Sequence, residues 1–167
     1  MQSSENVLSL LRQVSSLSFA AKSEANTGWQ GVGNGKVVVS EPMPKTVVFH
    51  ETGTWQPSTE HQGVFDFSNV FRWSAVGEHL RLEHLRFGVD NPVLLFDMAC
   101  YADGIWRDIS PHECGADLYA ATLEIAGGKD EATRIVVAWS IIGPRKQETI
   151  EYCYQTAPET SLEADRS

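Results

Sequence analysis

Along most of the chain, hydrophobic and polar residues alternate one by one, which is the pattern of a β-strand with one buried face. In residues 64–75, aromatic side chains take one face and polar side chains the other. Isoleucine, valine, tryptophan and tyrosine repeat the alternation towards the C-terminus. We expect strands at 36–41, 46–55, 64–75, 79–87, 92–102, 105–111, 117–126, 132–142 and 147–155.

Turn-forming residues separate these runs. Asp103-Gly104 is the sharpest turn signal, because Asp-Gly suits a two-residue hairpin turn. Gly31, Gly33 and Gly35 indicate a turn or a kinked first strand. Many antiparallel strands joined by short turns form a meander, and closing a long meander removes its exposed edges. We therefore predict an all-β protein, a closed antiparallel up-and-down barrel of 8–10 strands.

Only the first segment has a helical period, with Val7, Leu10, Leu11 and Val14 on one face. Such a helix needs a packing partner, because a short helix is marginal alone in water. We predict a helix over about 4–22 that plugs one end of the barrel. The single domain is expected to span 1–156, and the polar, acidic segment 157–167 is predicted to be a disordered tail.

The composition restricts the classes of molecule that the protein is expected to bind. Thirteen basic and 22 acidic residues give a net charge of -9, which disfavours nucleic acid and anionic membranes. No window approaches the roughly 20 apolar residues that cross a bilayer. The three cysteines lack Cys-x-x-Cys spacing, which fits reduced thiols. We expect a cytoplasmic protein without a cofactor.

A run of reactive residues interrupts the strand pattern at 112–119. Alternation puts His112 and Cys114 on one side and Asp117 and Tyr119 on the other. A β-bulge at Gly115 would bring all four to one face, whereas a plain turn at Gly115 is the alternative. Buried charges are costly unless they are paired or meet a ligand, so the run indicates either a polar cavity or a structural network.

If these side chains converge, His112 and Asp117 form a competent general base, with Tyr119 as a proton donor. A satisfied core network is the other interpretation. A zinc site would need a second ligand pair elsewhere, so we predict no metal. Cys114 is expected to be a small buried thiol rather than a nucleophile.

Arg145 stands at the start of the last predicted strand. Its guanidinium suits a carboxylate, which is either a ligand's or one of the chain's own, Glu51, Glu83 or Asp117. Aromatic residues with a few polar groups build ligand pockets, and they also build β-cores. The predicted ligand-binding residues are Arg145, His112, Cys114, Tyr119, Glu51, Trp73, His84, Trp139 and Tyr152. His84 is expected to face inward.

The pattern His112-x-Cys114-x-x-Asp117-x-Tyr119 is followed by Trp139, by Gly143-Pro144-Arg145-Lys146 and by Tyr152 or Tyr154. Over about residues 5–155 it resembles an uncharacterised domain family of bacteria and fungi. That family is similar to the calycins, the lipocalin-like and fatty-acid-binding-protein-like barrels. Gly28-Trp29 and Gly53-Thr54-Trp55 resemble the Gly-x-Trp neighbourhood of calycins. After Gly-Pro-Arg-Lys the family has an acidic and an aromatic residue, where this chain has Gln147-Glu148. The resemblance implies a barrel and no particular activity.

Three functions fit these observations. The first is intracellular binding of a small, largely apolar ligand whose polar or carboxylate end lies near Arg145, His112 and Asp117. The alternative is a lyase, cyclase or isomerase on the same barrel, with His112, Asp117 and Tyr119 as catalytic residues and Arg145 as an anion clamp. In the third, side chains fill the interior and an outer face binds a partner protein. The sequence determines neither the ligand nor the oligomeric state.

Overall fold

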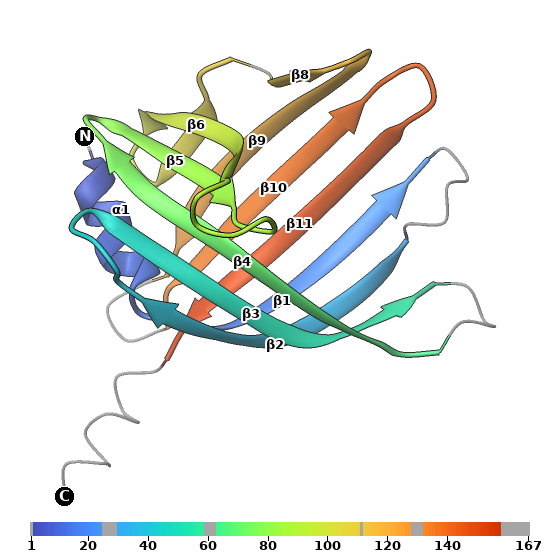
Figure 1. Ribbon diagram of the computed structural model, residues 1–167, viewed down its shortest axis with the longest axis horizontal. Coiled ribbons are helices and arrows are strands. Elements are labelled where there is room, and N and C mark those ends of the chain that lie inside the picture. The colour runs from blue at the N-terminus through green and yellow to red at the C-terminus, as the bar shows by residue number, and fades with distance from the viewer. Residues whose placement is uncertain (1, 25–29, 59–62, 111, 128–131, 158–167) are drawn as a thin grey trace, which may run out of the picture.

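The computed structural model describes residues 2–24, 30–58, 63–110, 112–127 and 132–157, without the side chains of His112 and Cys114. The predicted tail therefore lies outside the described residues, except for residue 157. Figure 1 shows the elements. They are α1 (Ser4–Leu11), β1 (Val14–Ser23), β2 (Gly31–Ser40), β3 (Thr46–Pro57), β4 (Phe65–Val76), β5 (His79–His84), β6 (Val93–Ala102), β7 (Ile105–Asp108), β8 (His112–Cys114), β9 (Asp117–Ala126), β10 (Arg134–Ile142) and β11 (Gln147–Thr156).

Ten of the strands close into a barrel. Their order is β10-β11-β1-β2-β3-β4-β5-β6-β7-β9, and a pairing between β9 and β10 completes the ring. The short strand β8 pairs with β9 outside this ring. All the pairings are antiparallel. The all-β barrel predicted from the sequence is confirmed, with ten strands in the closed wall.

The N-terminal segment corrects one prediction. The helix ends at Leu11 instead of near residue 22, and Val14–Ser23 forms strand β1. β1 pairs with β2 on one side and with β11 on the other, so the barrel could not close without it. The pairing of Val14–Ser23 with β2 and β11 outweighs the helical spacing of its hydrophobic residues. Local sequence preferences are weak compared with tertiary contacts.

The helix closes one end of the barrel. Ser3 caps it by accepting a hydrogen bond from the backbone of Asn6, and Val7, Leu8 and Leu11 are completely buried. The Ser4 hydroxyl donates to the carbonyl oxygen of Gly77 at 2.8 Å, which ties the helix to the turn between β4 and β5. Figure 1 shows α1 beside the ends of β3 and β4. The predicted plug is therefore present, as a shorter helix.

The turns agree with the sequence pattern. Ala102 and Ile105 face each other across the Asp103-Gly104 turn, where Gly104 has a φ of 78°. A positive φ suits glycine, since it lacks a Cβ. The glycines at 31, 33 and 35 lie within β2 rather than in a turn, and β2 pairs with β1 and β3 without a register shift, so the predicted kink stays a prediction.

Burial changes along the barrel. Near α1 the interior is filled, and Trp73, Leu80 and Trp106 are at most 1% exposed. We call the half opposite α1 the far half. There, inward-facing side chains that pack on the core are only partly buried, and these are Phe19, Phe67, Tyr119, Trp139 and Ile150. Solvent therefore reaches the far half more readily than the helix end. In the described part of the chain, no helix is long and apolar enough to cross a membrane.

Candidate functional site: a buried carboxyl group under aromatic rings

The side chain of Glu51 lies inside the barrel and has no solvent exposure. It stands on β3, two residues after the fully buried Phe49, so strand alternation points both side chains inward. The Tyr154 hydroxyl donates a hydrogen bond of 2.6 Å to Oε2 of Glu51. Oε1 has no hydrogen-bond partner among the described residues. A buried acceptor without a partner is costly, so this atom is a candidate ligand contact.

Burial changes the acidity of this carboxyl group. Desolvation raises the pKa of Glu51 from 4.5 to about 7, although the hydrogen bond from Tyr154 and the nearby amide of Asn69 act in the opposite direction. Asn69 lies directly opposite Glu51 on β4. The same burial, with the nearby Glu51 carboxylate, raises the pKa values of Tyr152 and Tyr154. Glu51 therefore changes charge near neutral pH, while both phenols stay protonated.

Five rings in contact with one another lie beside this carboxyl group. We call them the aromatic cluster, Phe19, Phe67, Phe71, Trp139 and Tyr152. Tyr152 is at its centre, with ring centroids 5.6 Å from Phe19, 6.5 Å from Phe71 and 5.7 Å from Trp139. Phe19 also meets Phe67 edge to face at 5.3 Å. These rings form an apolar surface in the far half.

Tyr154 connects the two parts of the site. Its ring stacks on Tyr152 at 5.8 Å and 7°, and its hydroxyl holds Glu51. The indole Nε1 of Trp139 is buried and has no hydrogen-bond partner within the described ranges. Among the described residues, the buried side-chain atoms without a partner are thus Oε1 of Glu51 and the indole nitrogens of Trp139 and of Trp73, which lies in the filled part of the core.

The reactive run at 112–119 forms a hairpin at the edge of the barrel. Cys114 pairs with Asp117, and Gly115, with a φ of 64°, starts a two-residue turn. The predicted bulge at Gly115 is therefore wrong, and the plain turn is correct. The register sets His112 opposite Tyr119. The side chains of His112 and Cys114 lie outside the described residues, so their convergence with Asp117 and Tyr119 stays a prediction.

Asp117 and Arg145 lie at the rim of the far half. The Asp117 carboxylate contacts Lys146 at 3.9 Å and covers Gly143 so closely that a Cβ at 143 would overlap it. Arg145 is exposed in the turn between β10 and β11. The carboxylates considered as its partners have other contacts. Glu51 accepts from Tyr154, Glu83 pairs with Arg72 at 3.0 Å, and Asp117 lies near Lys146.

The other predicted ligand-binding residues divide between the two halves. His84 is half-buried and stacks on Phe71 with 4.8 Å between ring centroids, which agrees with its expected inward orientation. Burial, together with the charge of Arg86, lowers the pKa of His84. Trp73 lies in the filled part of the core, where its ring meets Phe49 at 6.3 Å. The structure therefore brings Glu51, Trp139, Tyr152 and His84 into one half and leaves Trp73 beneath them.

Sequence reasoning missed two members of the site. Tyr154 enters the sequence prediction only as part of the family pattern, and only Tyr152 is among the predicted ligand contacts. Asn69 interrupts the aromatic face of β4 between Phe67 and Phe71, and this polar residue at an inward position was the available signal. The hydrogen bond between Tyr154 and Glu51 joins residues 103 positions apart, so no local pattern could reveal it.

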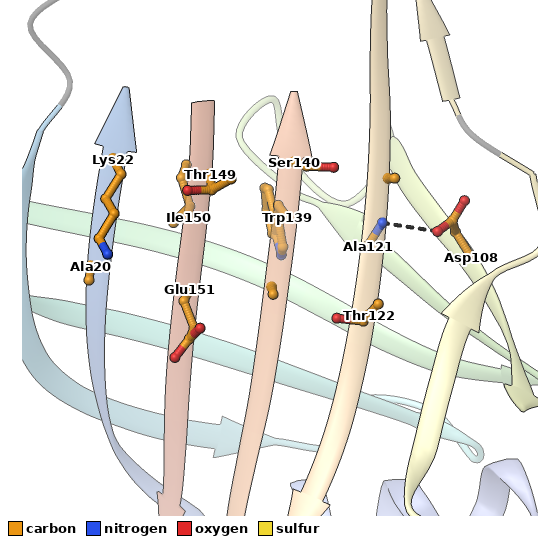
Figure 2. A pocket seen from close by; sticks show the side chains of 12 residues that line it. Ala20, Lys22, Asp108, Ala121, Thr122, Trp139, Ser140, Thr149, Ile150 and Glu151 are labelled. Atoms are coloured by element: carbon orange, nitrogen blue, oxygen red, sulfur yellow. Dashed lines mark hydrogen bonds between the residues drawn. The ribbon is translucent and has the colours of Figure 1, made fainter. Parts of the chain in front are cut away.

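A hollow lies on the outer wall of the barrel. It has a volume of about 500 Å³ and is lined mainly by outward-facing residues of β1, β9, β10 and β11, with the inward-facing residues Ala121, Trp139 and Ile150 also along it. Figure 2 shows Lys22 and Glu151 beside small side chains such as Thr122 and Ser140. Asp108, at its margin, accepts a hydrogen bond from the backbone of Ala121 at 3.1 Å. Among the described residues, buried side-chain atoms without a partner occur on Glu51, Trp73 and Trp139, and of these only Trp139 also lines this hollow, so the interior is the stronger candidate site.

The fold and the site define a closed β-barrel with a buried carboxyl group under aromatic rings. The chain belongs to DUF6314, a family of unknown function, which it matches over residues 9–156. No curated protein and no solved structure matches the chain. Membership of an uncharacterised domain family is thus confirmed, whereas the His112-to-Tyr119 and Gly143-to-Lys146 signature and the similarity to calycins stay predictions. Gly28 and Trp29, part of that resemblance, lie outside the described residues. Among those residues, no three or more His, Cys, Asp and Glu side chains are grouped to hold a metal ion.

Proposed function

We propose that this protein binds a small, largely apolar molecule in the far half of its barrel. One observation carries the proposal. A completely buried carboxyl group with an unpartnered oxygen, Oε1 of Glu51, lies next to rings that solvent still reaches. Ligand sites are commonly apolar and aromatic, with a small number of polar groups that fix orientation.

The distribution of packing supports the far half as the place of binding. The helix end is filled by α1 and by large side chains such as Trp73 and Trp106. In contrast, Phe19, Phe67 and Trp139 are only partly buried although they face inward. A ligand in the far half would bury the apolar surface that these rings still expose, at about 25 cal/mol per Å².

The position of the ligand's polar end differs from the sequence-based expectation. Glu51 is the buried polar group next to Tyr152 of the aromatic cluster, and Tyr154 fixes the position of its carboxyl group. Asp117 and Arg145 lie at the rim instead. A contact between the ligand and His112 or Arg145 remains a proposal that concerns this rim.

Binding can be tested with N-phenyl-1-naphthylamine, an uncharged probe whose fluorescence rises in apolar surroundings. We expect saturable binding of one probe per chain, weakened several-fold by Phe67→Ala. Phe87→Ala is the matched control, because Phe87 is 63% exposed outside the cluster and its loss should leave the affinity unchanged. Absence of saturable binding, or equal effects of the two variants, would contradict the proposal.

A second candidate function is acid–base catalysis on the same site. The observation that favours it is the pKa of Glu51, about 7, in a carboxyl group held by a phenol. A general acid or base works best with a pKa near the working pH. Small molecules that copurify with the wild type and with Glu51→Gln can be compared by mass spectrometry. The same molecule on both proteins, or its loss from the variant, supports binding alone, whereas accumulation on the variant of a precursor of the wild-type molecule supports turnover of a substrate.

A further inference from the structure

We infer that the ligand is a hydrophobic amine whose protonated nitrogen pairs with Glu51 beneath the aromatic cluster. This inference rests on the proposed function and adds the chemical class of the ligand. The first observation concerns the charged side chains inside the barrel. At the strand positions that alternate inward, the described residues include no lysine and no arginine, so Glu51 has no cationic side chain beside it.

The groups around Glu51 do not replace that cation. On β11, Tyr152 and Tyr154 are neutral phenols, and on β4 the neighbour is the amide of Asn69. β1 and β2 present Phe19, Leu17 and glycines to the interior, which carry no charge. His84 on β5 stacks on the far side of Phe71, and burial disfavours its charged form.

Above about pH 7 Glu51 is a buried carboxylate, which is costly unless a partner neutralises it, so the polar end of a ligand bound there must suit a negative charge. A ligand carboxylate would repel Glu51. An alcohol would donate one hydrogen bond to Oε1 but leave the charge uncompensated. An ammonium group supplies both the donor and the positive charge. The faces of Tyr152, Phe71 and Trp139 add favourable cation–π contacts.

The covered position of Glu51 determines how such an amine enters. Glu51 has no exposed surface, so a ring of the cluster must move aside. Phe19 and Phe67 are partly buried and touch each other at 5.3 Å, edge to face. Phe19 also lies directly on Gly33, where a Cβ would overlap its ring. An entering amine would displace these two rings. The apolar part of the amine would then pack where Phe19 and Phe67 now contact each other.

The inference can be tested with three matched probes, 3-phenylpropylamine, 3-phenylpropan-1-ol and 3-phenylpropanoate, whose binding is measured by calorimetry at pH 8. We expect the amine to bind at least tenfold more tightly than the alcohol, and the carboxylate to bind most weakly. An alcohol or carboxylate that binds as tightly as the amine would overturn the inference while the proposed function stands. If none of the three binds and N-phenyl-1-naphthylamine does not bind either, the proposed function itself fails.

Substitutions can show which residue causes the protein to prefer the amine over the alcohol. Glu51→Gln should reduce the amine affinity to that of the alcohol, with the alcohol unaffected. Glu148→Gln is the matched control, an acidic side chain at an inward position of β11 nearer the rim, and it should leave the amine preference in place. Loss of the preference in Glu148→Gln but not in Glu51→Gln would overturn the inference.

The pH dependence provides a test that needs no variant. An aliphatic amine with a pKa of about 10 stays protonated between pH 6 and 8. Over this range Glu51 loses its proton, so the amine should bind about tenfold more tightly at pH 8 than at pH 6. The alcohol should show no such gain. An amine affinity that stays constant or falls as the pH rises would contradict pairing with Glu51.

Discussion

The hydroxyl of Tyr154 and the Oε2 atom of Glu51 lie 2.6 Å apart, and their hydrogen bond joins the last strand of the barrel to its third strand. Both side chains are almost completely buried. A hydrogen bond to a charged or half-charged group contributes more than a neutral one, and a broken one leaves a buried acceptor without a partner. This pair is therefore expected to stabilise the barrel as well as to shape the site.

Tyr154→Phe removes the donor and leaves both oxygens of Glu51 without a firm partner. We expect the free energy of unfolding to fall by about 1–3 kcal/mol. The pKa of Glu51 should rise further, because the Tyr154 hydrogen bond lowers it. Tyr152→Phe is the matched control, since no described residue hydrogen-bonds its hydroxyl. Urea denaturation measures both variants, and equal losses would refute the role of the Tyr154 hydrogen bond.

The raised pKa of Glu51 predicts how stability depends on pH. The folded-state pKa of about 7 exceeds the unfolded value of 4.5, so the folded protein holds this proton more tightly. The stability from this proton is complete below pH 4.5 and is lost as the pH rises through 7, a change on the order of 3 kcal/mol. Urea denaturation from pH 5 to 8 should show this decline in the wild type and a flatter profile in Glu51→Gln. Parallel profiles would contradict the assignment.

A substitution at Gly33 tests whether the Phe19 ring packs directly on β2. A Cβ at residue 33 would overlap the Phe19 ring, so Gly33→Ala must push that ring from the wall of β2. We expect a loss of about 1–3 kcal/mol in the free energy of unfolding, typical of an overpacked core, together with altered binding of the naphthylamine probe. Gly63→Ala is the control, because a Cβ there would meet nothing within 4 Å. Thermal denaturation compares the two, and an unchanged Gly33→Ala would show that Phe19 moves freely.

The short helix α1 is expected to stabilise the folded protein through its buried face. Leu8 is completely buried, and Leu8→Ala should lower the free energy of unfolding by about 2–5 kcal/mol, as cavities in a packed core do. Leu10, only partly buried on the same helix, serves as the control, and Leu10→Ala should cost clearly less. Guanidinium denaturation of both variants gives the comparison. Similar losses at the two positions would mean that α1 does not act as a packed plug.

The strands of the barrel could be predicted from the sequence because each has a buried and a less buried face. The alternation in Phe65–Val76 and Arg134–Ile142 follows from that asymmetry, and the turn at Asp103-Gly104 follows from local backbone chemistry. The segment Val14–Ser23 was misread as helix because its place between β2 and β11 depends on partners distant in the sequence.

The candidate site was only partly predictable for a similar reason. The run from His112 to Tyr119 drew attention because its reactive residues are close in sequence. Glu51 and Tyr154 are single residues on distant strands, and only the closed sheet brings them together. Glu51 was considered as a partner for Arg145, yet its actual partner is a phenol. The partner of Glu51 depends on strand register and on barrel closure, and both of these depend on the whole chain.

The pairing of β1 with β11 also has a consequence for protein synthesis. Strand β11 is translated last of all the barrel strands, so the ring stays open on the ribosome until residues 147–156 have emerged. Until then Glu51 remains hydrated and ionised, and both neighbouring strand edges are available to chaperones. Ring closure, dehydration of the carboxyl group and its uptake of a proton are thus expected to coincide once residues 147–156 have been synthesised.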